Sequence, residues 1–245
     1  HYRCKGKTAA NLNFLQNTPT GFRSEGILYA QLVNESQFDH GITHDVSKER
    51  GEMIKKHISI YEQKLNECPF IEKWTPNRSE SILHSQSQSD IFNDKDESHK
   101  LLLRFIGKNF FDIHGLKITD GELPDSEKMR LDQNILLNET AMKLFGYKEV
   151  EEAFIRSKEA LWFSYNTETQ KVVQGGLEPM PVQAVVSDFY SGHVSEGVKP
   201  ILFIVNNERM EGSVAITVQK GKEKETIDYL KQMVKEATGS DEFVY

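Results

Sequence analysis

The chain has 245 residues and a mass of 28.1 kDa, enough for one large domain or two small ones. Hydrophobic residues make up 38% and charged residues 27%, which excludes a wholly disordered protein. The net charge of -7 would repel phosphate backbones, so nucleic acid is not an expected partner. The longest unbroken apolar run, Ile201 to Val205, is far shorter than the roughly 18 residues of a membrane span, so we expect none in this sequence.

The start of the chain and its two cysteines restrict the possibilities further. The first residue is His1, so we expect a processed product or a segment of a longer protein. Residues 2–7 are polar and basic, with no apolar region after them, so we expect no signal peptide here. Cys4 and Cys68 lack CxxC spacing, which excludes a cysteine-based zinc site or a thioredoxin-type motif. They allow a single disulfide.

The first part of the chain predicts a strand, a helix and a second strand. Ile27 to Val33 is an apolar stretch bounded by Gly26 and Asn34, which is typical of a strand. A helix is expected from Ser47 to Cys68, because apolar residues recur at spacings of three and four: Ile54, Ile58, Tyr61 and Leu65. A second strand is expected over residues 70–75. Residues 77–100 are rich in Ser, Gln, Asp and Asn and predict a long polar loop, with a weak strand around Ile82 and Leu83.

The middle of the chain predicts mostly short strands, with one short helix. Asn138 is expected to cap that helix, Ala141, Leu144 and Phe145 to line its apolar side, and Gly146 to end it. Another helical turn or two is expected over residues 148–155. Strands are expected over the following ranges: 101–106, 135–137, 161–165, 171–174, 181–188 and 201–205.

The end of the chain repeats the pattern of its beginning. Gly212 to Lys220 alternates like a half-buried strand, and residues 223–238 carry Ile227, Leu230 and Val234 at helical spacing before Gly239. A last short strand is expected over residues 243–245. Two strand-helix-strand units can pair into one split βαβ, ferredoxin-like sheet, so we predict an α+β fold with a β-rich block inserted between them.

Few residue patterns point to catalysis or to a bound cofactor. His40 and His44, beside Asp39 and Asp45, offer metal-ligand chemistry, but Gly41 places them in a loop and a solvated surface is the favoured interpretation. Glu151 with Glu152, and the acids among residues 94–97, are interpreted as solvated charge rather than acid/base pairs. No phosphate-binding glycine motif and no G-x-S-x-G elbow occurs. We therefore predict no catalytic, cofactor-binding or metal-binding residues and no enzymatic activity.

One aromatic cluster offers a binding surface. Alternation along residues 161–165 puts Phe163 and Tyr165 on one face of a strand and Trp162 on the other. Core packing explains most such clusters, and a patch for a partner is the alternative.

Several segments, in this order along the chain, resemble the MacB-like periplasmic core domain of MacB/FtsX-type ABC transporter permeases. The resemblance rests on Gly21-Phe22, Phe110 to Asp112 with Gly115 to Ile118, Ile135 to Ala141 with Leu144 to Tyr147, Val182 to Phe189 with Pro200 to Phe203, and Asp241 to Tyr245. It spans most of the chain, and its strength lies in the ordered series of segments.

The resemblance implies a porter-type subdomain with an inserted, β-rich Sabre-type subdomain. The porter-like part would be formed by residues 1–107 and 208–245, and the Sabre-like insertion by residues 108–207. It also implies a non-catalytic periplasmic domain of an inner-membrane permease. Such a domain couples its own transmembrane helices to substrate handling or to periplasmic or outer-membrane partner proteins, while a separate cytoplasmic subunit hydrolyses ATP. The alternative from a different class is a free-standing secreted module that binds a ligand or a protein.

Overall fold

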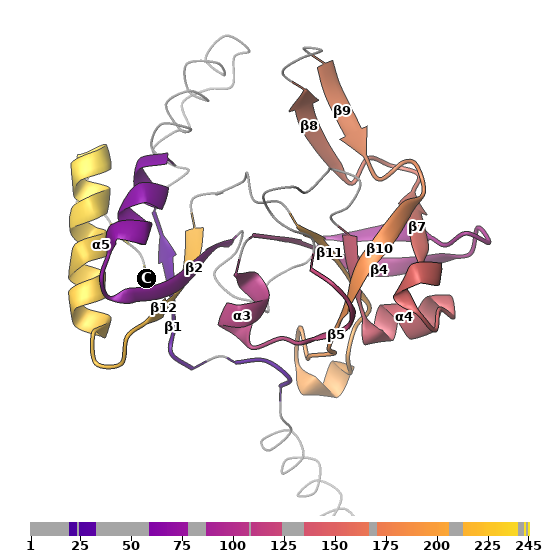
Figure 1. The fold of residues 1–245 in the computed structure, drawn as a ribbon, viewed down its shortest axis with the longest axis horizontal. Helices are drawn as coiled ribbons and strands as arrows, with labels where there is room; N and C mark the ends of the chain where they lie inside the picture. The colour runs from indigo at the N-terminus through magenta and orange to yellow at the C-terminus, as the bar shows by residue number, and fades with distance from the viewer. Residues whose placement is uncertain are drawn as a thin grey trace, which may run out of the picture. The chain divides into compact units, whose positions relative to one another are not determined.

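The computed structural model describes residues 20–23, 25–32, 59–77, 87–107, 109–123, 135–166, 171–205, 213–239, 243 and 245. The chain divides into two compact units. Unit 1 comprises His1–Arg23, Leu83–Arg104 and Gly115–Ile204, and unit 2 comprises Ser24–Ile82, Phe105–His114 and Val205–Tyr245. Strand-rich sheets with few helices make up both units, which confirms the expected α+β class (Figure 1).

Unit 2 is built on a three-stranded antiparallel sheet of order β1-β12-β2. These strands are β1 (Ile27–Gln31), β2 (Ile71–Asn77) and β12 (Ser213–Val218). The central strand β12 pairs Val214 with Ala30 on one side and Ile216 with Trp74 on the other. The predicted sharing of one sheet by the strand near residue 30 and the strand near residue 216 is confirmed.

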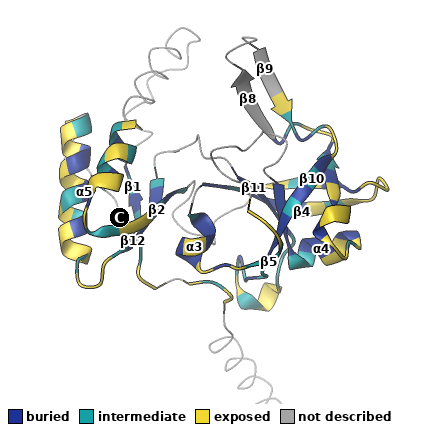
Figure 2. Ribbon diagram, viewed as in Figure 1, coloured by how far each residue is buried: buried dark blue, intermediate teal, exposed yellow. Residues whose placement is uncertain are grey.

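Two helices cover one face of this sheet. They are the helix over residues 59–67 and α5 (Glu223–Thr238), and buried residues lie on the side of α5 that faces the sheet (Figure 2). Tyr61, Leu65 and Leu230 are at most 1% exposed and form one cluster with the apolar strand residues. The expected burial of the apolar side of α5 is thus confirmed at Leu230. Ile58, expected on the apolar side of the first helix, lies outside the described residues.

A short helix, α3 (Phe110–His114), covers the opposite face of the same sheet. Strand alternation directs Trp74 toward the α5 side and its neighbour Lys73 away from it. Lys73 donates to Asp112 of α3 at 2.5 Å, which fixes α3 over that second face. The sequence predicted strands in this region, so this helix is a correction.

Unit 1 contains a seven-stranded sheet that closes on itself. Its order is β5-β10-β6-β11-β4-β3-β7, and β7 also pairs with the start of β10, so six of the strands form a ring while β5 is added beside β10. The strands are β3 (Gln88–Phe92), β4 (Ser98–Ile106), β5 (Ile118–Gly121), β6 (Ile135–Asn138), β7 (Phe154–Ser157), β10 (Met180–Val186) and β11 (Ile201–Val205). Every residue of β6 and β11 is buried, as expected for strands covered on both faces.

The helix α4 (Glu139–Phe145) packs on β6 and β10. Asn138 caps its start and Gly146, with a φ of 76°, ends it, which confirms both predicted caps. Ala141 and Phe145 are buried as expected, but Leu144 is 41% exposed and Met142 takes its place in the core. The prediction was therefore wrong at Leu144. In so short a helix, the spacing of apolar residues does not determine which side faces the core.

Several other elements differ from the sequence-based expectations. The expected polar loop over residues 77–100 contains β3 and the start of β4, because Ile91 and Phe92 supply a buried strand end inside a polar stretch. The expected helical turns after residue 148 reduce to one 3-10 turn, η2 (Val150–Glu152), before β7. Phe243 and Tyr245 lie outside any strand, and Phe243 instead packs against the core of unit 2.

Contacts between strands and helices decide which segments belong to each unit. Leu83–Arg104 belongs to unit 1 because β3 and β4 pair with β7 and β11, and Phe105–His114 belongs to unit 2 because α3 packs on β2 and β12. The chain therefore passes from one unit to the other within β4. Among the described residues, no helix is both long enough and apolar enough to cross a membrane.

Candidate functional site

A hydrogen-bonded network joins α4 to the loop after β10 in unit 1. The amide nitrogen of Asn138 donates to Asp188 Oδ1 at 2.8 Å and to the Lys199 carbonyl at 3.0 Å. Its side-chain oxygen accepts from the backbone N–H groups of Ala141 at 3.1 Å and of Ile201 at 2.8 Å. Both donors and both acceptor positions of this buried amide are therefore used.

Asp188 completes this network from the other side. Its carboxylate accepts from the Thr140 backbone N–H at 2.9 Å and from the Thr140 hydroxyl at 2.7 Å, in addition to Asn138. An anion at the start of α4 also complements the helix dipole. The sequence predicted the Asn138 cap but not its three distant partners, Asp188, Lys199 and Ile201.

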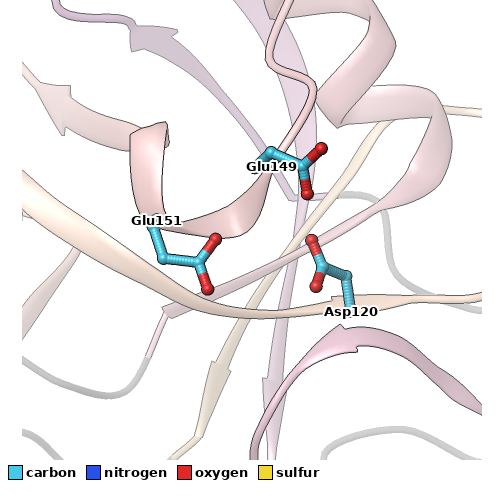
Figure 3. A group of neighbouring side chains, drawn as sticks. All are labelled: Asp120, Glu149 and Glu151. Carbon is cyan, nitrogen blue, oxygen red and sulfur yellow. The ribbon is translucent and has the colours of Figure 1, made fainter.

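An acidic cluster lies where β5 meets η2. Asp120, Glu149 and Glu151 each place one carboxylate oxygen within 4.8 Å of the other two (Figure 3). Asp120 also accepts from the backbone N–H groups of Val150 at 3.0 Å and of Gly121 at 2.8 Å, so it ties β5 to the 3-10 turn.

The acidic cluster has the donor chemistry of a hard-cation site, and its members Glu149 and Glu151 are exposed. Asp120 and Glu149 escaped sequence reasoning because 29 positions separate them, and Glu151 had been paired with Glu152 instead. Asp120 is the member of the cluster with backbone partners, whereas Glu149 and Glu151 are exposed.

The acids of the β3–β4 turn are engaged in local contacts. Asn93 accepts from two backbone N–H groups of the turn, those of Lys95 at 3.0 Å and Glu97 at 2.9 Å. Asp94 lies 2.9 Å from the hydroxyl of Tyr147, whose pKa is raised by burial, and Asp96 pairs with Arg156. These acids therefore contribute to the local structure of the turn and to its contacts with Tyr147 and Arg156.

The histidines do not converge on a common site in the described part of the chain. His99 contacts Phe145 edge to face at 5.2 Å, and His193 caps the 3-10 turn η3 (Val194–Glu196) through Ser195. His114 is fully buried, with its ring 3.2 Å from the Tyr29 hydroxyl. Asp39 and Asp45 lie outside the described residues. The same holds for the other histidines, His1, His40, His44, His57 and His84.

The aromatic strand forms a separate two-stranded sheet. β8 (Trp162–Asn166) pairs with β9 (Lys171–Gly175), with Phe163 opposite Gln174 and Tyr165 opposite Val172. The side chains of β8 lie outside the described residues. The predicted alternation of its aromatic residues between two faces stays a prediction.

Comparison with known proteins defines the fold. No protein-family model and no curated protein sequence matches the chain. The periplasmic region of MacB from Actinobacillus actinomycetemcomitans superposes on it with a TM-score of 0.50 and 18% identity, covering 94% of this chain and 92% of that one. The chain therefore has the fold of a MacB-type periplasmic domain, as its sequence segments predicted.

Two further solved structures are similar. A domain of a protein assigned as a permease from Porphyromonas gingivalis has a TM-score of 0.48 and 14% identity, covering 74% of this chain and 78% of that one. The extracellular domain of the noncanonic ABC-type transporter YknZ from Gram-positive bacteria has a TM-score of 0.46 and 13% identity, covering 74% and 86%.

Proposed function

We propose that this chain is the extracytoplasmic domain of an ABC transporter permease and that it couples movement of transmembrane helices to substrate handling or to signalling with partner proteins. The observation that carries this proposal is the fold, which matches a MacB periplasmic region over 94% of the chain. Because fold alone does not determine function, the ordered sequence segments provide the second support.

Those segments have structural roles that this fold needs. The Asn138–Ala141 segment and the Asp188–Phe189 segment, both part of the resemblance, meet in one hydrogen-bonded network. We assign unit 2, with its three-stranded sheet and two helices on one face, to the porter-like part, and unit 1 to the Sabre-like part. This assignment moves residues 83–104 into the Sabre-like part relative to the boundaries expected from sequence.

The proposed role is non-catalytic. Asp120, Asp96 and His114 have structural partners, namely the Val150 backbone N–H, Arg156 and the Phe110 carbonyl, which supports a structural role for these groups. Its proposed partners are the protein's own transmembrane helices and a separate cytoplasmic ATPase subunit, with periplasmic or outer-membrane proteins as further candidates. Its proposed location is the periplasmic side of the inner membrane.

Two measurements test the proposal. The full gene should encode apolar spans of about 20 residues on both sides of this segment. Cell fractionation should place the full-length protein in the membrane, with this domain accessible to protease only from the periplasmic side. A protein released in soluble form without such spans would instead support the alternative, a free-standing secreted binding module.

A further inference from the structure

The segment Thr20–Arg23 is attached to unit 1, although the strand that follows it, β1, belongs to unit 2. The backbone N–H of Tyr190 donates to the Thr20 carbonyl at 2.9 Å. The ring of Phe22 meets Phe189 edge to face, with centroids 6.0 Å apart and planes at 77°. A backbone bond and an aromatic contact thus hold the segment against the loop after β10.

Gly21 is required for this close approach. Its φ of +81° lies in the left-handed region, and a Cβ there would lie 2.8 Å from the Asp188 carbonyl oxygen and 3.0 Å from Phe189 Cα. Both obstacles are backbone or backbone-adjacent atoms that cannot rotate away. Gly26 has a similar φ of +71°, but nothing lies within 4 Å of its added Cβ. The two glycines therefore carry the same backbone strain on substitution and differ in steric collision.

The surface that receives this segment is well fixed. The Asp188 carboxylate is held by Thr140 and Asn138, as described above. Phe189 is 1% exposed, and its ring lies 6.3 Å from Phe203 and 5.8 Å from the Arg104 guanidinium carbon. A displacement of residues 20–23 would therefore reach the network around α4 and β11 through packed and hydrogen-bonded groups.

The other end of the chain belongs to unit 2. β12 is the central strand of its sheet, and α5 supplies Leu230, Met233 and Val234 to its core. The described residues near the two chain ends are consequently fixed to different units.

We propose that residues 20–23 act as a clasp through which the N-terminal side of the chain moves unit 1 directly, while the C-terminal side moves unit 2. The inference rests on the proposed function, in which each end continues into a transmembrane helix. A change in the separation of those helices then acts as a relative displacement of the two units. Gly21 and Phe22 are the positioning residues of this device, and neither has a catalytic role.

The first experiment tests the clasp in this 245-residue chain by hydrogen exchange. Gly21→Val should accelerate exchange of the Tyr190 amide at least about tenfold, and Phe22→Ala should accelerate it less, because the backbone bond can still form. Gly26→Val is the matched control and should leave that amide unchanged. Amides of α5 should exchange at the wild-type rate in all variants. Unchanged exchange at Tyr190 in Gly21→Val, or acceleration spread equally over α5, would overturn the clasp.

The second experiment tests the coupling in the membrane-embedded full-length protein. Spin labels at Leu144 on α4 and Asp228 on α5, both exposed, report the distance between the units with and without ATP on the partner ATPase. The nucleotide-dependent shift in distance should occur in wild type and in Gly26→Val and be lost in Gly21→Val. An equal shift in Gly21→Val would refute the inference. Absence of any shift in wild type would instead refute the proposed coupling function, while the exchange result would still stand for the clasp.

Discussion

Removing the Asp188 carboxylate provides a quantitative test of the network in unit 1. Asp188→Ala deletes the acceptor of three hydrogen bonds, from Asn138 Nδ2, Thr140 N and Thr140 Oγ1, at 2.8, 2.9 and 2.7 Å. At about 1 kcal/mol net for each bond, the free energy of unfolding should fall by about 3 kcal/mol. For a chain of this size that corresponds to a Tm lower by about 6–12 °C.

Thermal and urea unfolding followed by far-ultraviolet circular dichroism measure this loss. Asp188→Asn keeps the shape but replaces one acceptor with a donor, so it should also destabilise the protein. Asp90→Ala, an exposed aspartate on β3 in the same unit, is the matched control and should change stability by no more than about 0.5 kcal/mol. If Asp188→Ala were as stable as that control, the network would not hold α4 to the loop after β10, and the structural role assigned to it would be wrong.

Four further predictions address unit 2 and the chain as a whole. Leu230→Asp should unfold the three-stranded sheet with its helices, because Leu230 is 0% exposed, and loss of α5 amide protection in hydrogen exchange would show it. Burial raises the pKa of Tyr61 and of Tyr229 above the usual 10.0. The neutral phenols therefore stabilise unit 2 below about pH 10, and this stabilisation should be lost as the pH rises above it. Urea unfolding measured across that pH range would contradict the assignment if the free energy of unfolding did not fall. Cys68 is a free, buried cysteine in the structure, and an oxidising compartment would permit a bond to Cys4; thiol titration of periplasm-derived protein under denaturing, non-reducing conditions excludes that bond if it finds two free thiols. Cys68 is buried, whereas Cys4 lies outside the described residues. Purified protein should neither hydrolyse ATP nor melt at a higher temperature in its presence, as calorimetry and a phosphate-release assay can establish.

Elements with a strong local pattern could be predicted from the sequence. The helical spacing that ends at Gly239 predicted α5 over its full length, and Gly239 has the left-handed φ of 73° that this position needs. In contrast, β3 was missed because three polar residues are followed by two apolar ones, so the strand does not alternate, and its pairing with β4 and β7 decides its structure. Local propensity is a weak guide where cross-strand contacts dominate.

The same distinction applies to the candidate sites. The Asn138 cap follows from residues 138–141 alone, since the cap and the helix are contiguous. Its bond to Asp188 joins residues 50 positions apart, and Asp120 reaches the Val150 amide across 30 positions. Such contacts depend on strand order in a closed sheet, which single-sequence periodicity does not encode.

The position of β12 at the centre of its sheet has a consequence for how the protein is made. β1 and β2 flank this strand and do not pair with each other, so during synthesis they have no sheet partner in unit 2 until residues 213–218 have emerged. Unit 1, whose ring of strands ends at residue 205, can close earlier. A nascent chain stalled between these two points would present a finished unit 1 and two unpaired strands of unit 2, which invite pairing with other chains. Emergence of residues 213–218 is thus the step that pairs β1 and β2, and a truncation before residue 213 would leave unit 1 folded and these two strands unpaired.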